Sequence, residues 1–238
     1  MYDFLDKDLG PVVIKRNYRA KRVIVRRKHN AVEMTVPKHL TNSEIKKHFE
    51  TLKPQILALP IKEVVKITEN SNIETFTFDV VIKRKLSDRN NIGMSLEEQI
   101  LTINVPTQYD INGDNVQLAI KDLLIYALRH EAKRVLPNKV LTLAKKNGLN
   151  VSEIKINNSK NRWGSCSNKR NINLSLFLMM LPEHLIDYVI LHELAHTIEL
   201  NHSARFWQLL DILCNGKAQE LDNECSNWST DYLYCLKQ

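Results

Sequence analysis

The sequence predicts an α+β protein in which a compact helical core with a short sheet follows a β-rich N-terminal domain. Short β-branched runs, broken by polar turns, occupy residues 11–37. Long segments with a helical spacing of apolar residues begin only after a turn at Asn112-Gly113. We therefore expect a β-rich domain over residues 1–112 and a second domain over residues 113–238.

The composition is that of a folded protein that stays in water. Of the 238 residues, 43% are hydrophobic and 26% are charged. The N-terminus has no basic start followed by an apolar run, and the longest apolar run, residues 174–181, is too short to span a bilayer. The four cysteines form no C-x-x-C pair and fit reduced thiols. We expect a cytoplasmic protein with no membrane partner.

The net charge of +7 has two interpretations. Eight Lys or Arg residues fall between Lys15 and Lys28, and on strands many of them would share one solvated face. A basic surface can also favour a nucleotide or a nucleic acid as partner. Tyr18 is the only aromatic residue among these cations, so little in this stretch could stack on bases. We therefore expect a solvated face and keep the anionic partner as an alternative.

Three elements are expected between residues 41 and 106. Thr41 and Glu44 form a capping box, which predicts a short helix to about residue 52, before Pro54. Residues 75–83 alternate between apolar and polar and predict a half-buried strand. A further strand should end near residue 106.

The second half of the chain predicts helices around two short strands. One helix should run from about Asn115 to Val135 and break at Pro137, and a second should end at Gly148. Strands near 152–157 and 171–177 should flank a turn-rich stretch at 161–170. Pro182 suits the first turn of a further helix, whose buried face we assign to Leu185, Ile186, Val189, Ile190 and Leu194.

That last helix carries the pattern H-E-x-x-H at residues 192–196. Residues four apart lie on the same side of a helix, so His192 and His196 can reach one ion. Glu193 is offset by about 100° and can act on a water as a general base without being a ligand. This is the arrangement of a metal-dependent hydrolase.

A catalytic zinc site needs a third protein ligand, and two candidates follow. Glu199 lies about 4.5 Å further along the helix axis, so we expect a supporting or solvated role for it. His202 can be a ligand only if the chain turns before it, and Leu200-Asn201 offers such a turn. Ser203 is then the N-cap of a helix over residues 204–213.

Three segments together resemble the YgjP-like metallopeptidase family: 162-RWGSCS-167, 187-DYVILHELAH-196 and 202-HSARFW-207. Members of this family are compact zincins related at the motif to SprT-type proteases. The resemblance implies a zincin-like core, one Zn²⁺ per chain held by His192, His196 and His202, and Glu193 as catalytic base. It also implies a peptide or protein substrate. The given sequence has no C-x-x-C pairs of the kind that form the cysteine zinc module common in the SprT group.

The segment around Trp163 and Cys166 has a structural and a functional interpretation. Trp163 should be in the core, Gly164 should allow two backbones to approach closely, and Cys166 should be a small buried residue rather than a nucleophile. Alternatively, this strand edges the active-site cleft and pairs with an extended peptide. Arg162 and Arg205 are then candidates for contacts with the substrate or the transition state.

Two further assignments complete the prediction for the helices. The pairs His130-Glu131 and Glu183-His184 lack ligand spacing and should be surface residues. Phe206 and Trp207 should pack their helix onto the helix with the two histidines.

Two other functions remain open from the sequence. The same site could hydrolyse a phosphoanhydride as a metal-dependent nucleotide pyrophosphatase or phosphohydrolase, although such sites favour carboxylate-bound Mg²⁺. A nucleic-acid-associated, SprT-like protein could instead hold a structural metal, with Glu199 or Cys166 as a fourth ligand.

Overall fold

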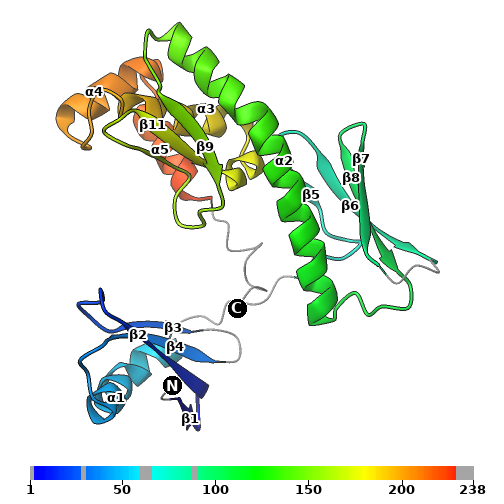
Figure 1. Ribbon diagram of the computed structural model, residues 1–238, viewed down its shortest axis with the longest axis vertical. Helices are drawn as coiled ribbons and strands as arrows, with labels where there is room; N and C mark the ends of the chain where they lie inside the picture. The colour runs from blue at the N-terminus through cyan, green and yellow to red at the C-terminus, as the bar shows by residue number, and fades with distance from the viewer. Residues whose placement is uncertain (1–2, 28–30, 59–65, 87–90, 229–238) are drawn as a thin grey trace. The chain divides into compact units, whose positions relative to one another are not determined.

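The computed structural model describes residues 3–27, 31–58, 66–86 and 91–228, and its fold is α+β as predicted. The chain forms two compact units, one made mainly of residues 1–65 and one of residues 66–236 (Figure 1). The elements in chain order are β1 (Phe4–Asp6), β2 (Gly10–Asn17), β3 (Ile24–Arg27), β4 (Val32–Pro37), α1 (Asn42–Ala58), β5 (Ile73–Glu74), β6 (Asp79–Lys85), β7 (Gly93–Glu97), β8 (Ile100–Pro106), α2 (Asp114–Lys146), β9 (Glu153–Asn157), β10 (Gly164–Cys166), β11 (Asn171–Ser175), the 3-10 helix η1 (Leu176–Met180), α3 (Glu183–Ala195), α4 (Ala204–Leu213) and α5 (Ala218–Ser226).

The N-terminal unit is a four-stranded sheet with one helix packed on it. The strand order is β1-β2-β4-β3, with β2 and β4 parallel and the outer pairs antiparallel. Alternate residues of β2 and β4 point towards α1, and they form a closed core with it. The buried residues of this core are Leu9, Val12, Ile14, Val32, Met34, Val36, Ile45, Phe49 and Ile56.

The capping box at the start of α1 is confirmed. The backbone N–H of Thr41 donates to Oε2 of Glu44 at 2.8 Å, and the N–H of Glu44 donates to the Thr41 hydroxyl at 3.3 Å. The predicted end near residue 52 is wrong, because α1 continues through Pro54 to Ala58. Burial of Ile56, which is 2% exposed, offsets the helix hydrogen bond that Pro54 cannot make.

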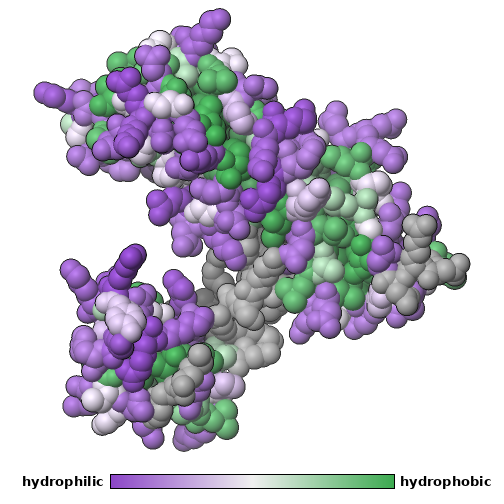
Figure 2. Space-filling view, in the orientation of Figure 1, coloured by the Kyte–Doolittle hydropathy of each residue, from purple (hydrophilic) through white to green (hydrophobic). Residues whose placement is uncertain are grey.

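The basic residues of the N-terminal unit lie mostly in solvent. Lys15, Arg16, Arg19, Lys21, Arg22 and Arg26 are all exposed, as the solvated-face interpretation requires, and Lys28 lies outside the described residues. Hydrophilic side chains dominate the visible surface of this unit (Figure 2). Residues 1–65 hold 14 Lys and Arg against 7 Asp and Glu, whereas residues 66–238 hold 20 of each. The positive excess therefore belongs to the N-terminal unit.

The second unit is organised along α2, which joins two sheets. Near its N-terminus, α2 packs against β8 of the sheet β5-β6-β8-β7, and further along it packs against β9, η1 and α3 (Figure 1). One continuous core runs through both parts. No helix in the described part of the chain is both long and apolar enough to cross a membrane.

The predicted break at Pro137 is wrong, because α2 is a single helix of 33 residues with Pro137 inside it. Leu136 and Val140 on either side of the proline are fully buried, and this packing outweighs the cost of about 3 kcal/mol that a helix-interior proline carries. The predicted end is confirmed. Gly148, at φ +65°, follows the helix, and the N–H of Leu149 donates to the Ala144 carbonyl at 2.9 Å.

Four smaller expectations are corrected. The strand predicted at 75–83 begins only at Asp79, because the Thr75 hydroxyl and N–H bind the Phe78 carbonyl in a turn. The second predicted strand ends at Ser175, whose hydroxyl caps η1. The turn-rich stretch at 161–170 also contains β10. Finally, Glu131 is buried and bonded to Arg134 at 2.6 Å, although His184 and Glu183 are exposed as expected.

The compact units divide the chain earlier than the sequence suggested. The boundary expected between residues 112 and 113 falls inside the second unit, directly before α2, because β8 packs on α2. Contacts define these units, and whether residues 1–112 and 113–238 are separate functional domains stays a prediction.

Replacing Thr41 by alanine should destabilise α1 by about 1 kcal/mol, because the capping bonds to Glu44 are lost. Hydrogen exchange of the α1 amides measures this directly. The matched control is Thr51→Ala, since the exposed Thr51 hydroxyl only bonds back to the Lys47 carbonyl and should matter by less than about 0.5 kcal/mol. Equal effects of the two substitutions would contradict the capping role.

Candidate metal centre and active site

Helix α3 presents two histidines at its C-terminal end, and most of its other residues are buried. Its predicted inner face is confirmed, because Leu185, Ile186, Val189, Ile190 and Leu194 are at most 5% exposed. His192 and His196 stand one turn apart at its C-terminal end, with ring centroids 5.0 Å apart. His196 is the C-cap, so the helix ends at the second histidine.

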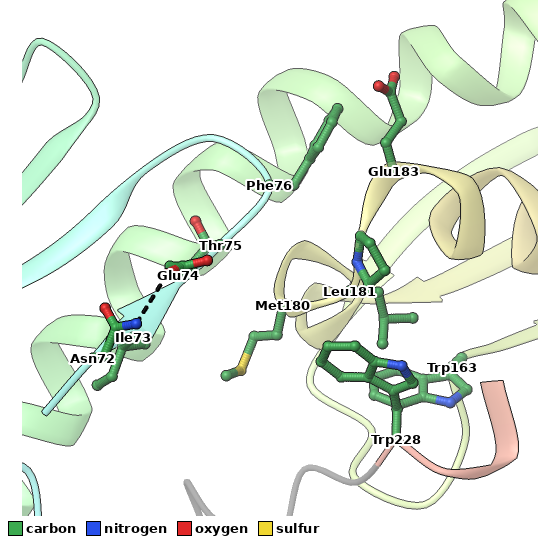
Figure 3. A pocket seen from close by; sticks show the side chains of 11 residues that line it. Asn72, Ile73, Glu74, Thr75, Phe76, Trp163, Met180, Leu181, Glu183 and Trp228 are labelled. Atoms are coloured by element: carbon green, nitrogen blue, oxygen red, sulfur yellow. Dashed lines mark hydrogen bonds between the residues drawn. The ribbon is translucent and has the colours of Figure 1, made fainter. Parts of the chain in front are cut away.

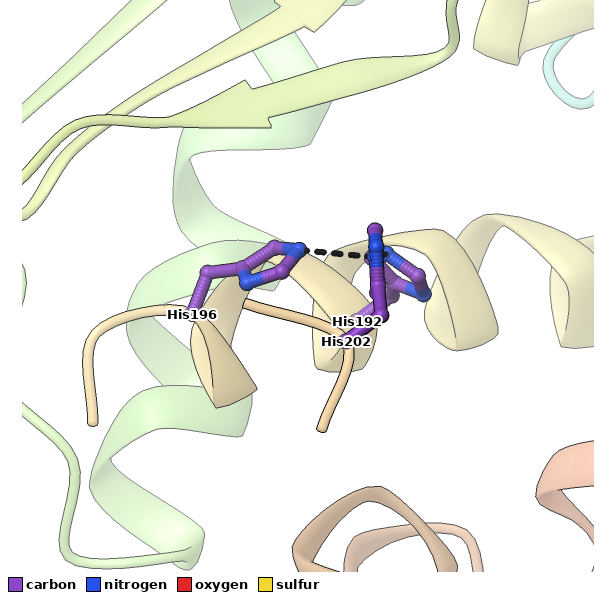
Figure 4. A group of neighbouring side chains, drawn as sticks. All are labelled: His192, His196 and His202. Atoms are coloured by element: carbon purple, nitrogen blue, oxygen red, sulfur yellow. Dashed lines mark hydrogen bonds between the residues drawn. The ribbon is translucent and has the colours of Figure 1, made fainter. Parts of the chain in front are cut away.

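The chain turns directly after α3 and brings a third histidine back. The N–H groups of Ile198 and Glu199 both donate to the Ala195 carbonyl at 3.0 Å, so the turn starts earlier than Leu200. Ser203 caps α4 as predicted, and its hydroxyl accepts from the N–H of Phe206 at 3.3 Å. His202 lies between these two ordered ends, on the side of His192 and His196 (Figure 4).

The three imidazoles converge on one point. Nε2 of His202 lies 3.0 Å from Nε2 of His192 and 3.1 Å from Nε2 of His196. One ligand atom from each of the three residues lies within 4.8 Å of the other two. Donors around a tetrahedral zinc ion, at about 2.0–2.1 Å from it, are separated by about 3.3 Å. The spacing of these nitrogens therefore fits a shared cation.

A second contact fixes the tautomer of His196, and burial affects the protonation of His192 and His196. The Nδ1 of His196 lies 2.9 Å from the Glu199 carbonyl, which can only accept, so the proton sits on Nδ1 and Nε2 keeps its lone pair. Burial lowers the pKa of His192 to about 4, and the neighbouring His196 and His202 add to this effect. Burial also lowers the pKa of His196. At neutral pH both rings are uncharged, as a metal ligand must be.

Phe206 forms the base on which the histidines rest. Its ring is fully buried and stacks on His196 with centroids 4.5 Å apart, and it meets His192 and His202 edge-on. The predicted packing of α4 onto α3 is therefore confirmed for Phe206. Trp207, half-buried, adds a longer contact of 6.3 Å to His202.

Glu193 is a buried carboxylate with one oxygen left over. It is 6% exposed, and Oε2 has no hydrogen-bond partner among the described residues. Burial raises the pKa of Glu193 to about 7, and the charge of Arg162 opposes this shift. An unpartnered, buried carboxylate is costly, and such groups concentrate at functional sites.

Strand β10 lies directly against Glu193 through Gly164. A Cβ at position 164 would meet Cγ and Oε1 of Glu193 at 2.6 Å, closer than any side chain tolerates. The predicted lack of room for a side chain at Gly164 is confirmed, but the close neighbour is the Glu193 side chain and not a second backbone as expected. Trp163 and Cys166 are only partly buried, and burial raises the pKa of the Cys166 thiol to about 11.

The sequence did not reveal a tie between α3 and α5 behind His192. The Tyr188 hydroxyl donates to Oδ1 of Asp222 at 2.7 Å, and the Tyr188 ring meets the His192 ring at 6.1 Å. Tyr188 precedes His192 by one helical turn, and this spacing is the signal that could have placed it beside the site. The two predicted arginines differ: Arg162 acts electrostatically on Glu193, and Arg205 is exposed on the first turn of α4.

Comparison with known proteins agrees with the motif. The model of the YgjP-like, metallopeptidase domain family matches residues 21–224. No curated protein matches the chain.

Two similar solved structures are described as metallopeptidase zymogens. The Pyrococcus abyssi abylysin zymogen is 23% identical over 38% of this chain and 90% of its own, with a TM-score of 0.35. The Methanocaldococcus jannaschii jannalysin zymogen is 25% identical over 38% of this chain and 89% of its own, with a TM-score of 0.33. Because the family match spans most of the sequence, the chain belongs to the YgjP-like metallopeptidase family and is a metal-dependent hydrolase.

Proposed function

We propose that the chain is a zinc-dependent peptidase that holds one ion with His192, His196 and His202 and uses Glu193 as general base. The convergence of three Nε2 atoms beside a buried carboxylate with a free oxygen carries this proposal. Three neutral imidazoles are a typical donor set for a catalytic zinc that keeps one position open. A bound zinc ion would lower the pKa of a water molecule to about 7 and polarise a carbonyl group.

Glu193 is suited to moving the proton. It follows His192 in the chain and is offset by about 100° around the helix, so it is close to the site without being one of the three grouped ligands. Gly164 closes the Oε1 side of its carboxylate, and Oε2 is buried without a hydrogen-bond partner among the described residues. We assign to this carboxylate the proton of the attacking water, which it then delivers to the departing amine.

A free strand edge supports a peptide substrate. The residues on either side of β10 are hydrogen-bonded to β11 or its end. The Ser175 N–H donates to the Trp163 carbonyl at 2.8 Å, and the Ser167 N–H donates to the Asn171 carbonyl at 3.0 Å. In an antiparallel pair, successive residues direct their backbone N–H and C=O groups alternately towards the partner strand and away from it. The backbone groups of Gly164 and Cys166 therefore face away from β11. An extended peptide can add to such an edge and pass beside Glu193.

The two alternatives gain less support. Residues 66–238 have no net charge, and the histidine cluster contains no carboxylate, so little favours a nucleotide at this site. A structural metal would need a fourth ligand, and within the described ranges neither Glu199 nor Cys166 joins the cluster.

The two arginines are proposed with different support. Arg162 is our candidate for a contact with the substrate or for stabilising negative charge in the transition state, because its charge already acts on Glu193. Arg205 is proposed for the same role from its place two residues after the Ser203 cap.

Replacing Glu193 by glutamine should keep the metal and reduce peptide cleavage by about 10²–10⁴-fold, because the base is lost while the histidines are unchanged. Metal content and peptide cleavage, measured on the same preparation, test this. Glu199→Gln is the matched control and should stay near wild type, since only the Glu199 backbone carbonyl contacts His196. A Glu193→Gln protein that retains zinc and cleaves as well as wild type would refute the role.

Replacing His202 by alanine should abolish tight zinc binding, because two histidines on one helix leave the ion without its third ligand. Added zinc should raise the melting temperature of wild type and leave that of His202→Ala unchanged. His184→Ala is the control, because His184 is exposed and bonded to Glu224. If His202→Ala binds zinc like wild type, the third ligand is assigned wrongly.

Gly164→Ala should lower cleavage by about tenfold or more while zinc is retained, because the new methyl group must displace the Glu193 carboxylate. Ser165→Ala is the control, since successive side chains of a strand point to opposite faces. Cleavage and metal content of the two variants are compared. Similar activities would show that the position of Glu193 beside β10 does not matter.

A further inference from the structure

A groove of about 670 Å³ opens near the start of α3 (Figure 3), and none of the three clustered histidines lines it. Its apolar lining comes from four separate parts of the second unit: the turn before β6, the segment before β10, the junction of η1 and α3, and the residues after α5. This lining includes Phe76, Trp163, Met180, Leu181, Pro182 and Trp228. The volume is in the range of sites that bind a ligand or a large side chain.

The aromatic residues of this groove are unusually accessible. Trp228 is 42% exposed, and Trp163 and Phe76 are only partly buried. Tryptophan is enriched among the residues that contribute most to binding, because it offers a large rigid surface at low entropic cost. Asn72 and Glu74 form a polar edge opposite the tryptophans (Figure 3). Nδ2 of Asn72 donates a hydrogen bond to Oε1 of Glu74 at 2.9 Å.

The turn that carries Phe76 is held in place. The Phe76 N–H donates to the Met179 carbonyl at 2.7 Å, which joins the turn before β6 to η1. The Lys139 ammonium lies 5.3 Å from the centroid of the Phe76 ring and bonds to Glu183 at 2.7 Å. Because these contacts join different elements, the Phe76 side of the groove is held in place before a ligand binds.

One residue of the groove lining is next in the chain to the residue that contacts Glu193. Trp163 directly precedes Gly164, against which Glu193 packs. At the far end, Glu183 lies ten residues before Glu193 on α3, or about 15 Å at 1.5 Å per residue. An extended peptide covers this distance in about four to five residues.

Strand direction indicates which end of a peptide reaches the groove. A peptide paired antiparallel with β10 runs from the Cys166 side towards Trp163, and antiparallel pairing is the more stable arrangement. The residues that pass Trp163 are then those on the carboxyl side of the cleaved bond. The apolar walls suit an aromatic or large aliphatic side chain there, and burying one stabilises the complex.

We propose that the groove lined by Trp163 and Trp228 binds an aromatic or large aliphatic residue of the peptide substrate, about two to five positions to the carboxyl side of the cleaved bond. This inference rests on the proposed peptidase function. It assigns a substrate preference to a surface that none of the three clustered histidines lines, with Trp228 as its most exposed apolar wall.

The preference can be measured with a library of randomised peptides digested by the zinc-loaded protein, with the products identified by mass spectrometry. Aromatic and large aliphatic residues should be enriched at these downstream positions for wild type. Trp228→Ala should lose the enrichment, and Trp228→Phe should restore most of it. Tyr126→Ala removes an aromatic residue that is 63% exposed on α2, and it should leave the preference unchanged.

Two matched peptides that differ only in this downstream residue, phenylalanine or serine, give the size of the effect. Trp228→Ala should lower kcat/KM by about tenfold for the phenylalanine peptide and by less than about twofold for the serine peptide. Equal losses for the two peptides, or no enrichment in wild type, would overturn the proposal.

Binding of the same labelled peptides to zinc-loaded Glu193→Gln protein separates the two proposals. Fluorescence anisotropy should show tighter binding of the phenylalanine peptide, and this difference should vanish when Trp228→Ala is added. If the difference is found but wild type cleaves neither peptide, the groove is supported and the peptidase function fails. If wild type cleaves both peptides and no difference in binding is found, the groove proposal fails alone.

Discussion

The meeting of three imidazole nitrogens at one point is the constraint on which the rest of the site depends. Nε2 atoms at 3.0 and 3.1 Å bring lone pairs together, and that arrangement is favourable only around a cation or a shared proton. To reach it, α3 must end at His196 and the chain must reverse within the next six residues. The Ser203 cap and the buried Phe206 ring hold the returning chain, so local structure after α3 serves the convergence of the histidines.

The buried carboxylate of Glu193 destabilises the fold relative to an apolar residue at the same position. Glu193 is buried, one of its oxygens lacks a partner in the described structure, and burial has shifted its pKa to about 7. Gly164 forfeits a side chain so that β10 can approach this carboxylate. Helix α3 and strand β10 thus both carry a locally unfavourable residue at the same place. This pattern is expected where structure is selected for chemistry rather than for stability.

Sequence patterns predicted the parts whose causes are local. The capping box at Thr41, the glycine end of α2, the buried face of α3 and the Ser203 cap depend on residues within a few positions of each other. The errors at Pro54 and Pro137 have the opposite origin, because tertiary burial of Ile56, Leu136 and Val140 carries both helices past a proline. The sequence predicted that His202 is a ligand only on the condition that the chain turns before it. The contact of Glu193 with Gly164 was not predicted, because it joins residues far apart in the chain.

The predicted domain boundary, which stays a prediction, also rests on local patterns, because it groups β5–β8 with the N-terminal strands. Strand-rich composition groups these residues with β1–β4, but composition does not say which surface a sheet packs on. The sheet β5-β6-β8-β7 shares the core of α2 with α3, and the turn before β6 bonds to η1 through Phe76. It therefore supplies one wall of the groove whose opposite wall is Trp163. A catalytic part that began at residue 113 would keep the three histidines and Glu193 but lose Phe76, so chemistry and substrate preference would rest on segments from both sides of that boundary.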